Sequence, residues 1–204
     1  RVISVRSTVD VAATIENVLS PALLMYQLRL SASATLEVRS STINGSQALG
    51  RKKSGTFTLD AEDNFLSTVA DDIAIALIHS TLLDGSRIRF SDVTVPNGGF
   101  AVTYTSFITA AAIEIANSTI GGPPGFVSFE HGNKLVRWEK QSVLRLRNVT
   151  IPGGVHIEAA PHDFTIEMAD GIAAATMNAT GVAASRGKLT VATMPAAGCS
   201  VTRV

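Results

Sequence analysis

The sequence lacks the features that define several large classes of protein. It has a single cysteine, Cys199, so neither a disulfide framework nor a zinc site built from cysteines can form. Its 17 Lys and Arg residues balance 17 Asp and Glu residues, which excludes a nucleic-acid binder that depends on bulk positive charge. No uncharged apolar run approaches the roughly 20 residues of a membrane-spanning helix. A globular chain with a sizeable core remains, because 46% of its 204 residues are hydrophobic.

Aromatic residues are also scarce, at 5% of the chain, so aliphatic side chains must fill most of the core. Ser and Thr together account for 39 residues, and Val and Ile are abundant. Branched side chains are stiff at their first rotamer and pack well on a pleated surface. The composition therefore predicts an all-β protein.

One eight-residue pattern recurs along the chain. It consists of an apolar residue, any residue, a second apolar residue, three mostly polar or small residues, Thr and a final apolar residue. Most copies run into a turn that contains glycine. The clearest copies are Leu36–Ile43, Ile75–Leu82, Ile88–Val95, Ile113–Ile120 and Leu144–Ile151. The two apolar residues point to the same side of a strand, and Asn or Asp in the polar triplet favours a bend before a second short strand.

The spacing of the copies indicates how they are arranged. The Thr position recurs at Thr42, Thr94, Thr119, Thr150 and Thr180. The last three intervals are 25, 31 and 30 residues, and we interpret the first, of 52 residues, as two units with 75–82 as an extra strand. Units of this length are typical of a parallel β-helix, here of roughly seven rungs. A β-sandwich is the alternative, because it also consists of short strands separated by frequent turns.

The segment Leu144–Gly154 and its counterparts at 88–99 and 113–122 resemble the right-handed β-helix proteins of the pectin-lyase-like class, by repeat rhythm over residues 30–195. The same runs resemble the surface proteins of the trypanosomatid dispersed gene family. The first resemblance implies a right-handed coil, and in its enzymatic members carboxylates on neighbouring rungs. The chain departs from the polygalacturonases, because their Asn-Thr-Asp, Asp-Asp, His-Gly and Arg-Ile-Lys segments do not occur in order.

We expect residues 1–204 to form a single β-helix domain that is a fragment or processed part of a longer chain. Residues 50–72 and 130–142 interrupt the repeat with clustered charges and are predicted to project as loops. The apolar stretch from Val9 to Leu30 is a candidate for a short helix that caps the end of the coil.

Few residues suggest catalysis or metal binding. Asp71 and Asp72, followed by His79, are the best acid–base candidates, although adjacent strand residues face opposite ways. His156, His162 and Asp163 are poorly spaced for a metal site, and Pro161 separates the two histidines. We therefore expect neither a metal nor a cofactor.

Other residues are candidates for modification or binding. Asn-x-Ser/Thr sites, which can carry glycans in a eukaryotic secretory pathway, occur at Asn44, Asn117, Asn148 and Asn178. Trp138 is the only tryptophan, and together with Arg137 it is a candidate for stacking on a sugar or anchoring a protein.

These observations predict a non-enzymatic, extracellular or cell-surface protein that uses a β-helix as a rigid scaffold for binding or adhesion. The alternative is a carbohydrate-active β-helix enzyme, either a polysaccharide lyase or a glycoside hydrolase. The expected partner is a protein or a glycan, and no nucleic acid or membrane span is expected. Exposed strand edges at the ends of the coil also allow end-to-end self-association.

Overall fold

The computed structural model describes residues 3–45, 73–121, 127–129, 136–138, 141–158, 164–178, 189–193 and 199–203. All regular secondary structure in these ranges is β-strand, which confirms the all-β prediction. The strands are β1 (Ile3–Val5), β2 (Thr8–Val9), β3 (Ala12–Glu16), β4 (Leu19–Ser20), β5 (Leu23–Tyr26), β6 (Arg29–Leu30), β7 (Thr35–Ile43), β8 (Ile73–Ile78), β9 (Thr81–Leu82), β10 (Arg87–Val95), β11 (Gly99–Thr103), β12 (Ser106–Phe107), β13 (Ala112–Ile120), β14 (Val127–Phe129), β15 (Arg137–Trp138), β16 (Ser142–Glu158), β17 (Phe164–Asn178), β18 (Leu189–Thr193) and β19 (Cys199–Arg203).

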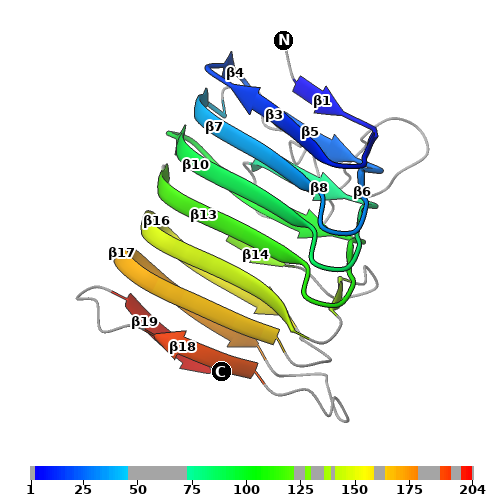
Figure 1. The fold of residues 1–204 in the computed structure, drawn as a ribbon. Coiled ribbons are helices and arrows are strands. Elements are labelled where there is room, and N and C mark those ends of the chain that lie inside the picture. The colour runs from blue at the N-terminus through cyan, green and yellow to red at the C-terminus, as the bar shows by residue number, and fades with distance from the viewer. Residues whose placement is uncertain are drawn as a thin grey trace, which may run out of the picture.

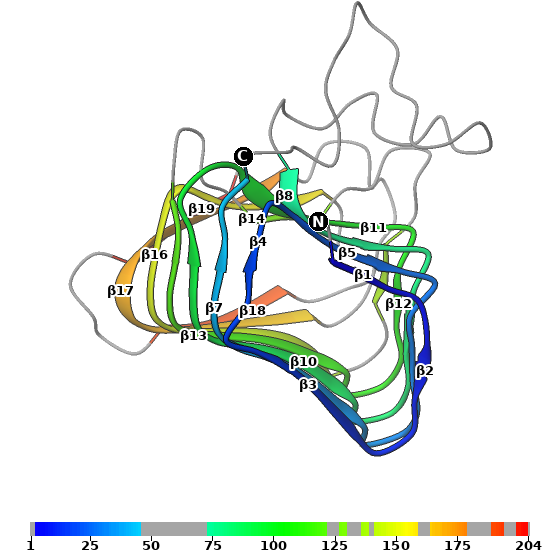
Figure 2. The ribbon, with the colours of Figure 1, turned by 90° about the horizontal axis from the view of Figure 1, so that it is seen from above.

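The strands form two sheets in which neighbours are distant in sequence. The larger sheet has the order β1-β5-β8-β11-β14-β16-β13-β10-β7-β3, and the smaller one has the order β15-β12-β9-β6-β2. Every pair between these strands is parallel, so the antiparallel pairing typical of a β-sandwich does not occur in the described ranges. Figure 1 shows β7, β10, β13, β16 and β17 side by side, and Figure 2 shows that consecutive strands lie on different sides of a common interior.

The repeated Thr position sets the register between neighbouring strands. Thr42 of β7 pairs with Thr94 of β10, Thr94 pairs with Thr119 of β13, and Thr119 pairs with Thr150 of β16. The prediction that successive copies of the pattern lie next to one another is therefore confirmed for the copies that contain Thr94, Thr119 and Thr150.

Two details of the predicted spacing are wrong. Thr42 and Thr94 are direct neighbours, so the 52 residues between them form one unit, and β8 lies in another row between β5 and β11. The extra length falls in residues 46–72, which are outside the described ranges. The next partner of Thr150 is Ile172 rather than Thr180, which the structure does not describe.

The core is a stack of like residues from successive strands. The first apolar position of the pattern contributes Leu36, Ile88, Ile113 and Leu144, which pair in register and are each at most 1% exposed. Parallel pairing without offset places identical positions above one another, so each aliphatic side chain packs on its counterparts. Burial of this shared interior is the main stabilising contribution to the fold.

A bend in the left-handed backbone region follows the apolar positions. Ser40, Asp92, Asn117 and Asn148 have φ values of 49°, 55°, 48° and 48°, which agrees with the bend predicted from Asn and Asp. At the bend, a serine hydroxyl replaces a missing backbone hydrogen bond between the strands. The Ser118 Oγ accepts a hydrogen bond from the Val93 N–H at 3.0 Å and donates one to the Ala116 carbonyl at 2.6 Å.

The predicted capping helix within Val9–Leu30 is wrong, because this stretch contains strands β2 to β6. In β5, Leu23 and Met25 are buried whereas Leu24 and Tyr26 are only half-buried, which is the two-residue period of a strand. Among the residues that the structure describes, no helix is long and apolar enough to cross a membrane.

The two predicted loops have different outcomes. All of the 50–72 segment lies outside the described ranges, as do 130–135 and 139–140. Within 130–142, however, Arg137–Trp138 form β15, which pairs with β12, and Ser142 begins β16. This segment therefore contributes a strand to the smaller sheet, because the chain must cross that side to begin the next unit.

Candidate functional site

A row of alternating charges crosses the solvent-facing side of the larger sheet. Its members occupy the position between the two buried apolar residues of the pattern, so they face away from the core. The row, here called the charged ladder, consists of Glu37, Arg89, Glu114, Arg145 and Glu167 on adjacent strands β7, β10, β13, β16 and β17. Each carboxylate is therefore next to a guanidinium, an arrangement that favours parallel pairing in this register.

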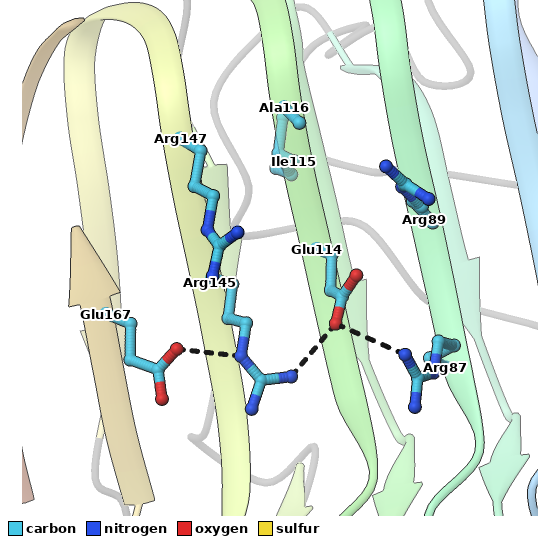
Figure 3. A pocket seen from close by; sticks show the side chains of 8 residues that line it. All are labelled: Arg87, Arg89, Glu114, Ile115, Ala116, Arg145, Arg147 and Glu167. Atoms are coloured by element: carbon cyan, nitrogen blue, oxygen red, sulfur yellow. Dashed lines mark hydrogen bonds and ion pairs between the residues drawn. The ribbon is translucent and has the colours of Figure 1, made fainter. Parts of the chain in front are cut away.

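Arg145 is the most strongly held member of the charged ladder. Its Nε donates to the Glu167 Oε2 at 2.7 Å, and its Nη1 donates to the Glu114 Oε1 at 2.9 Å (Figure 3). The same Glu114 oxygen lies 3.8 Å from the Arg87 Nη1. Glu114 thus accepts from one arginine and attracts a second.

The contacts of Arg145 change its titration. Partial burial by itself lowers the pKa of Arg145, but the hydrogen bonds and negative charges of Glu167 and Glu114 outweigh it, so the pKa lies above its ordinary value. Arg145 remains a permanent cation at any physiological pH. It neutralises much of the charge of the two carboxylates on either side.

Beside the charged ladder lies a pocket of about 500 Å³. It is lined by Arg87, Arg89, Glu114, Ile115, Ala116, Arg145, Arg147 and Glu167, and is called here the arginine pocket. The space arises because the next row across the sheet contains Ser91, Ala116, Arg147 and Ala169, most of which have short side chains. Four arginines and two glutamates give the lining a formal charge of +2.

Arg147 differs from the other arginines of the pocket. Its side chain is exposed, and it makes no hydrogen bond or ion pair with the described part of the chain, whereas Arg145 is bound on both sides. In Figure 3, Arg147 and Arg89 stand on opposite sides of Ala116. The Nε of Arg89 lies 3.8 Å from the Glu37 Oε1, beyond hydrogen-bond distance. Arg87 is likewise 3.8 Å from the Glu114 Oε1. The pocket thus has three cations, Arg87, Arg89 and Arg147, whose donors are not engaged by close ion pairs.

The predicted acid–base group is only partly described. Asp71 and Asp72 lie outside the described ranges. His79 is exposed and belongs to an aromatic stack, with its ring 4.6 Å from Tyr104 and nearly parallel to it, and 5.8 Å from the edge-on ring of Tyr26. Tyr26 is the last residue of β5, and His79 and Tyr104 directly follow β8 and β11, so the three rings meet because these strands are neighbours.

The residues considered, and not favoured, as metal ligands are only partly described. His156 lies in β16, whereas His162 and Asp163 fall outside those ranges. No group of three potential metal-ligating side chains occurs among the described residues.

Two of the four Asn-x-Ser/Thr sites lie next to each other on the surface. Asn117 and Asn148 are exposed on neighbouring bends, and the Asn148 Nδ2 donates to the Asn117 Oδ1 at 3.2 Å. Asn44 is half-buried, and its carbonyl accepts from the Asn97 Nδ2 at 2.8 Å. Asn178 is the last residue of β17.

Arg137 and Trp138 do not join the arginine pocket. They form β15 in the smaller sheet, where they pair with Ser106 and Phe107 of β12. The predicted binding pair and the pocket therefore belong to different sheets.

The sequence interpretation missed the charged ladder, although a signal for it was present. The second position of the pattern was treated as unspecified, yet it reads Glu37, Arg89, Glu114 and Arg145 in the four copies that share the register. The copy at 75–82 has Ala76 at this position and lies in another row, which obscures the alternation. Alignment of the copies on their Thr position would have revealed it.

No family model matches this chain, and no curated protein or solved structure is significantly similar to it. The resemblances to pectin-lyase-like proteins and to the trypanosomatid dispersed gene family therefore stay predictions. Function must be argued from the geometry of the sheets and of the arginine pocket.

Proposed function

We propose that this chain is a right-handed parallel β-helix that acts as a rigid binding scaffold, not as an enzyme, and that the arginine pocket contacts its partner. The β-helix is supported by the unbroken pairing from Thr42 to Thr150 and by the path around a common interior in Figure 2. Its hand is supported by the strong preference of parallel crossover connections for right-handedness.

The observation that supports the binding role is that the carboxylates on the sheet face are paired with arginines. Glu16 is bound by Arg39, Glu37 lies near Arg89, and Glu114 and Glu167 share Arg145. Glycoside hydrolysis needs two carboxyl groups placed on either side of the scissile bond, whereas each of these carboxylates is paired with an arginine of a neighbouring strand. The same ion pairs fix the side chains around the pocket, which lowers the entropy that a partner would have to remove on binding.

The experiment compares binding with turnover. The purified chain is applied to immobilised carboxylated, sulfated and neutral polysaccharides, and the same polymers are assayed for new reducing ends and unsaturated products. We expect retention on charged polymers that weakens with salt, and no product. Product formation that Glu114→Gln abolishes would establish the enzyme alternative, and absence of both retention and product would contradict a scaffold that binds through this face.

We also propose that the scaffold works outside the cell or on its surface. Asn117 and Asn148 support this, because both sites lie on exposed bends where a glycan can extend into solvent. Expression in a eukaryotic secretory host is expected to yield a chain whose mass falls on glycosidase treatment. A secreted chain with all four asparagines unmodified would remove this support.

A second candidate function is head-to-tail assembly. Within the described ranges, strands β1, β2 and β3 pair on one side only, and at the other end β18 and β19 pair only with β17. Val11 and Leu19 at the first end are 80% and 76% exposed. Parallel edges at both ends of one molecule can pair with each other, which generates a filament when the contact does not close. Sedimentation should then show concentration-dependent oligomers that Leu19→Glu suppresses, and a strict monomer would contradict the assembly.

A further inference from the structure

We infer that the arginine pocket binds a single oxyanion group, a carboxylate, sulfate or phosphate, between Arg89 and Arg147 and above Ala116. This inference rests on the proposed binding function and specifies the chemistry of the ligand. It identifies the two binding cations and the residue that leaves room for the anion.

The spacing of the strands suits a bridging anion. Arg89 and Arg147 lie on β10 and β16, the two strands that flank β13. Neighbouring strands are about 4.8 Å apart, so these two strands are separated by about 10 Å. Figure 3 shows the Arg147 side chain running along β16 toward Arg145, so it would turn toward Ala116 for both guanidinium groups to donate to one small oxyanion. Guanidinium groups suit this task because their planar donors match carboxylate, sulfate and phosphate oxygens.

Charge and position together favour these two arginines: Arg87, Arg89 and Arg147 all lack close ion pairs, but Arg87 lies beside Glu114, whereas Arg89 and Arg147 lie on either side of Ala116 (Figure 3). Arg145 is already bound by Glu114 and Glu167 at 2.9 and 2.7 Å. Arg147 has no ion pair with the described residues, and the contact of Arg89 with its glutamate is 3.8 Å long. An incoming anion therefore gains donors without breaking the close contacts of Arg145.

The negative side chains of the lining do not prevent binding. The Glu114 Oε1 lies 2.9 Å from Arg145 and 3.8 Å from Arg87, so the two arginines share its negative charge. With Glu167 also bound to Arg145, both negative charges are offset locally, and the lining keeps its formal charge of +2. The pocket is consequently attractive to anions, and the attraction should decrease with ionic strength.

The test is a titration of the full chain with sodium phosphate, sodium sulfate or sodium acetate at constant ionic strength, followed through the side-chain Nε–Hε NMR signals of the arginines. We expect saturable shifts of Arg89 and Arg147. Arg147→Gln should weaken binding by about tenfold, because it removes charged hydrogen-bond donors. Comparison of the three anions shows whether the site prefers a tetrahedral group or a carboxylate.

Two further variants distinguish a defined site from diffuse attraction. Ala116→Met keeps every charge but fills the space between the two arginines, and it should weaken binding about as much as Arg147→Gln. Arg39→Gln removes an equal charge from the same sheet face outside the pocket and should change the affinity less than twofold. Circular dichroism confirms that each variant is folded before it is titrated.

Several results would overturn the inference. These are an absence of saturable shifts for all three anions, equal losses in Arg39→Gln and Arg147→Gln, or full binding by Ala116→Met. If the chain still binds charged polymers while Arg147→Gln has no effect, the scaffold function stands and the assignment of the pocket is wrong. If polymers are cleaved, the proposed function itself fails.

Discussion

The charged ladder predicts that two similar Arg–Glu pairs contribute unequally to stability. Arg145 and Glu114 have side chains that are 31% and 19% exposed, whereas Arg39 and Glu16, at the outer strands β7 and β3, are 48% and 44% exposed. Unit charges 4 Å apart attract by about 1 kcal/mol in water and by about 4 kcal/mol at the effective dielectric of a protein surface, before desolvation and side-chain entropy are subtracted. We therefore expect coupling energies of about 1 kcal/mol for Arg145–Glu114 and about 0.3 kcal/mol for Arg39–Glu16.

Two double-mutant cycles measure these energies. One uses Arg145→Met, Glu114→Gln and the double variant, and the other uses Arg39→Met, Glu16→Gln and their combination. Urea unfolding gives the free energy of each variant, and the non-additive part is the coupling. Repeating both cycles at high salt should reduce the Arg39–Glu16 coupling by the larger fraction, because this pair is more exposed. Equal coupling energies, or a larger one for Arg39–Glu16, would refute the argument that burial strengthens the Arg145–Glu114 pair.

The raised pKa of Arg145 determines how its contribution to the free energy of unfolding depends on pH. A base whose pKa is higher in the folded state stabilises the fold fully below its unfolded pKa, and this contribution is lost as the pH rises through the folded value. Both values are strongly alkaline for arginine. The contribution of the Arg145 titration is therefore expected to stay constant from neutral to mildly alkaline pH, and a fall in that range would show that another group is responsible.

Three further predictions concern the fold, each measured by urea unfolding. Phe90→Ala empties a core position that is 2% exposed and should cost about 3–5 kcal/mol; a cost below 1 kcal/mol would contradict the assigned burial. Ser118→Ala removes the acceptor of the Val93 N–H and should cost about 1–3 kcal/mol, whereas no loss would mean that this N–H finds another partner. Gly45→Ala should destabilise far more than Gly85→Ala, because φ is positive at both but a Cβ at Gly45 would lie 2.1 Å from a backbone oxygen; similar losses would show that only φ matters.

The strand register was predictable from the sequence because one short pattern encodes several levels of structure. Its Thr position identified Thr94, Thr119 and Thr150 as neighbours, although it placed Thr42 two units from Thr94, and its apolar positions identified the core. The N-terminal strands were not recognised, because apolar residues between Val9 and Leu30 are dense enough to suit a helix or strands. Pairing with β7 and β8 decides in favour of strands, and that information is not local.

The arginine pocket was less predictable than the fold. Its members come from four strands, and its volume depends on the short side chains of Ser91, Ala116 and Ala169 in the row next to the charged ladder. Neither property appears in any single copy of the pattern. Conversely, the candidates that stood out locally do not point to it: Arg137 and Trp138 lie in the smaller sheet, and Asp71 and Asp72 are outside the described ranges.

The alternation of the charged ladder limits how the chain can grow or shorten during evolution. Loss of the single unit that carries Glu114 would bring Arg89 directly beside Arg145, and like charges on adjacent strands are destabilising. Duplication of that unit alone would place two glutamates side by side. Units that are gained or lost in twos would keep the alternation of charge along the sheet, and single units would break it.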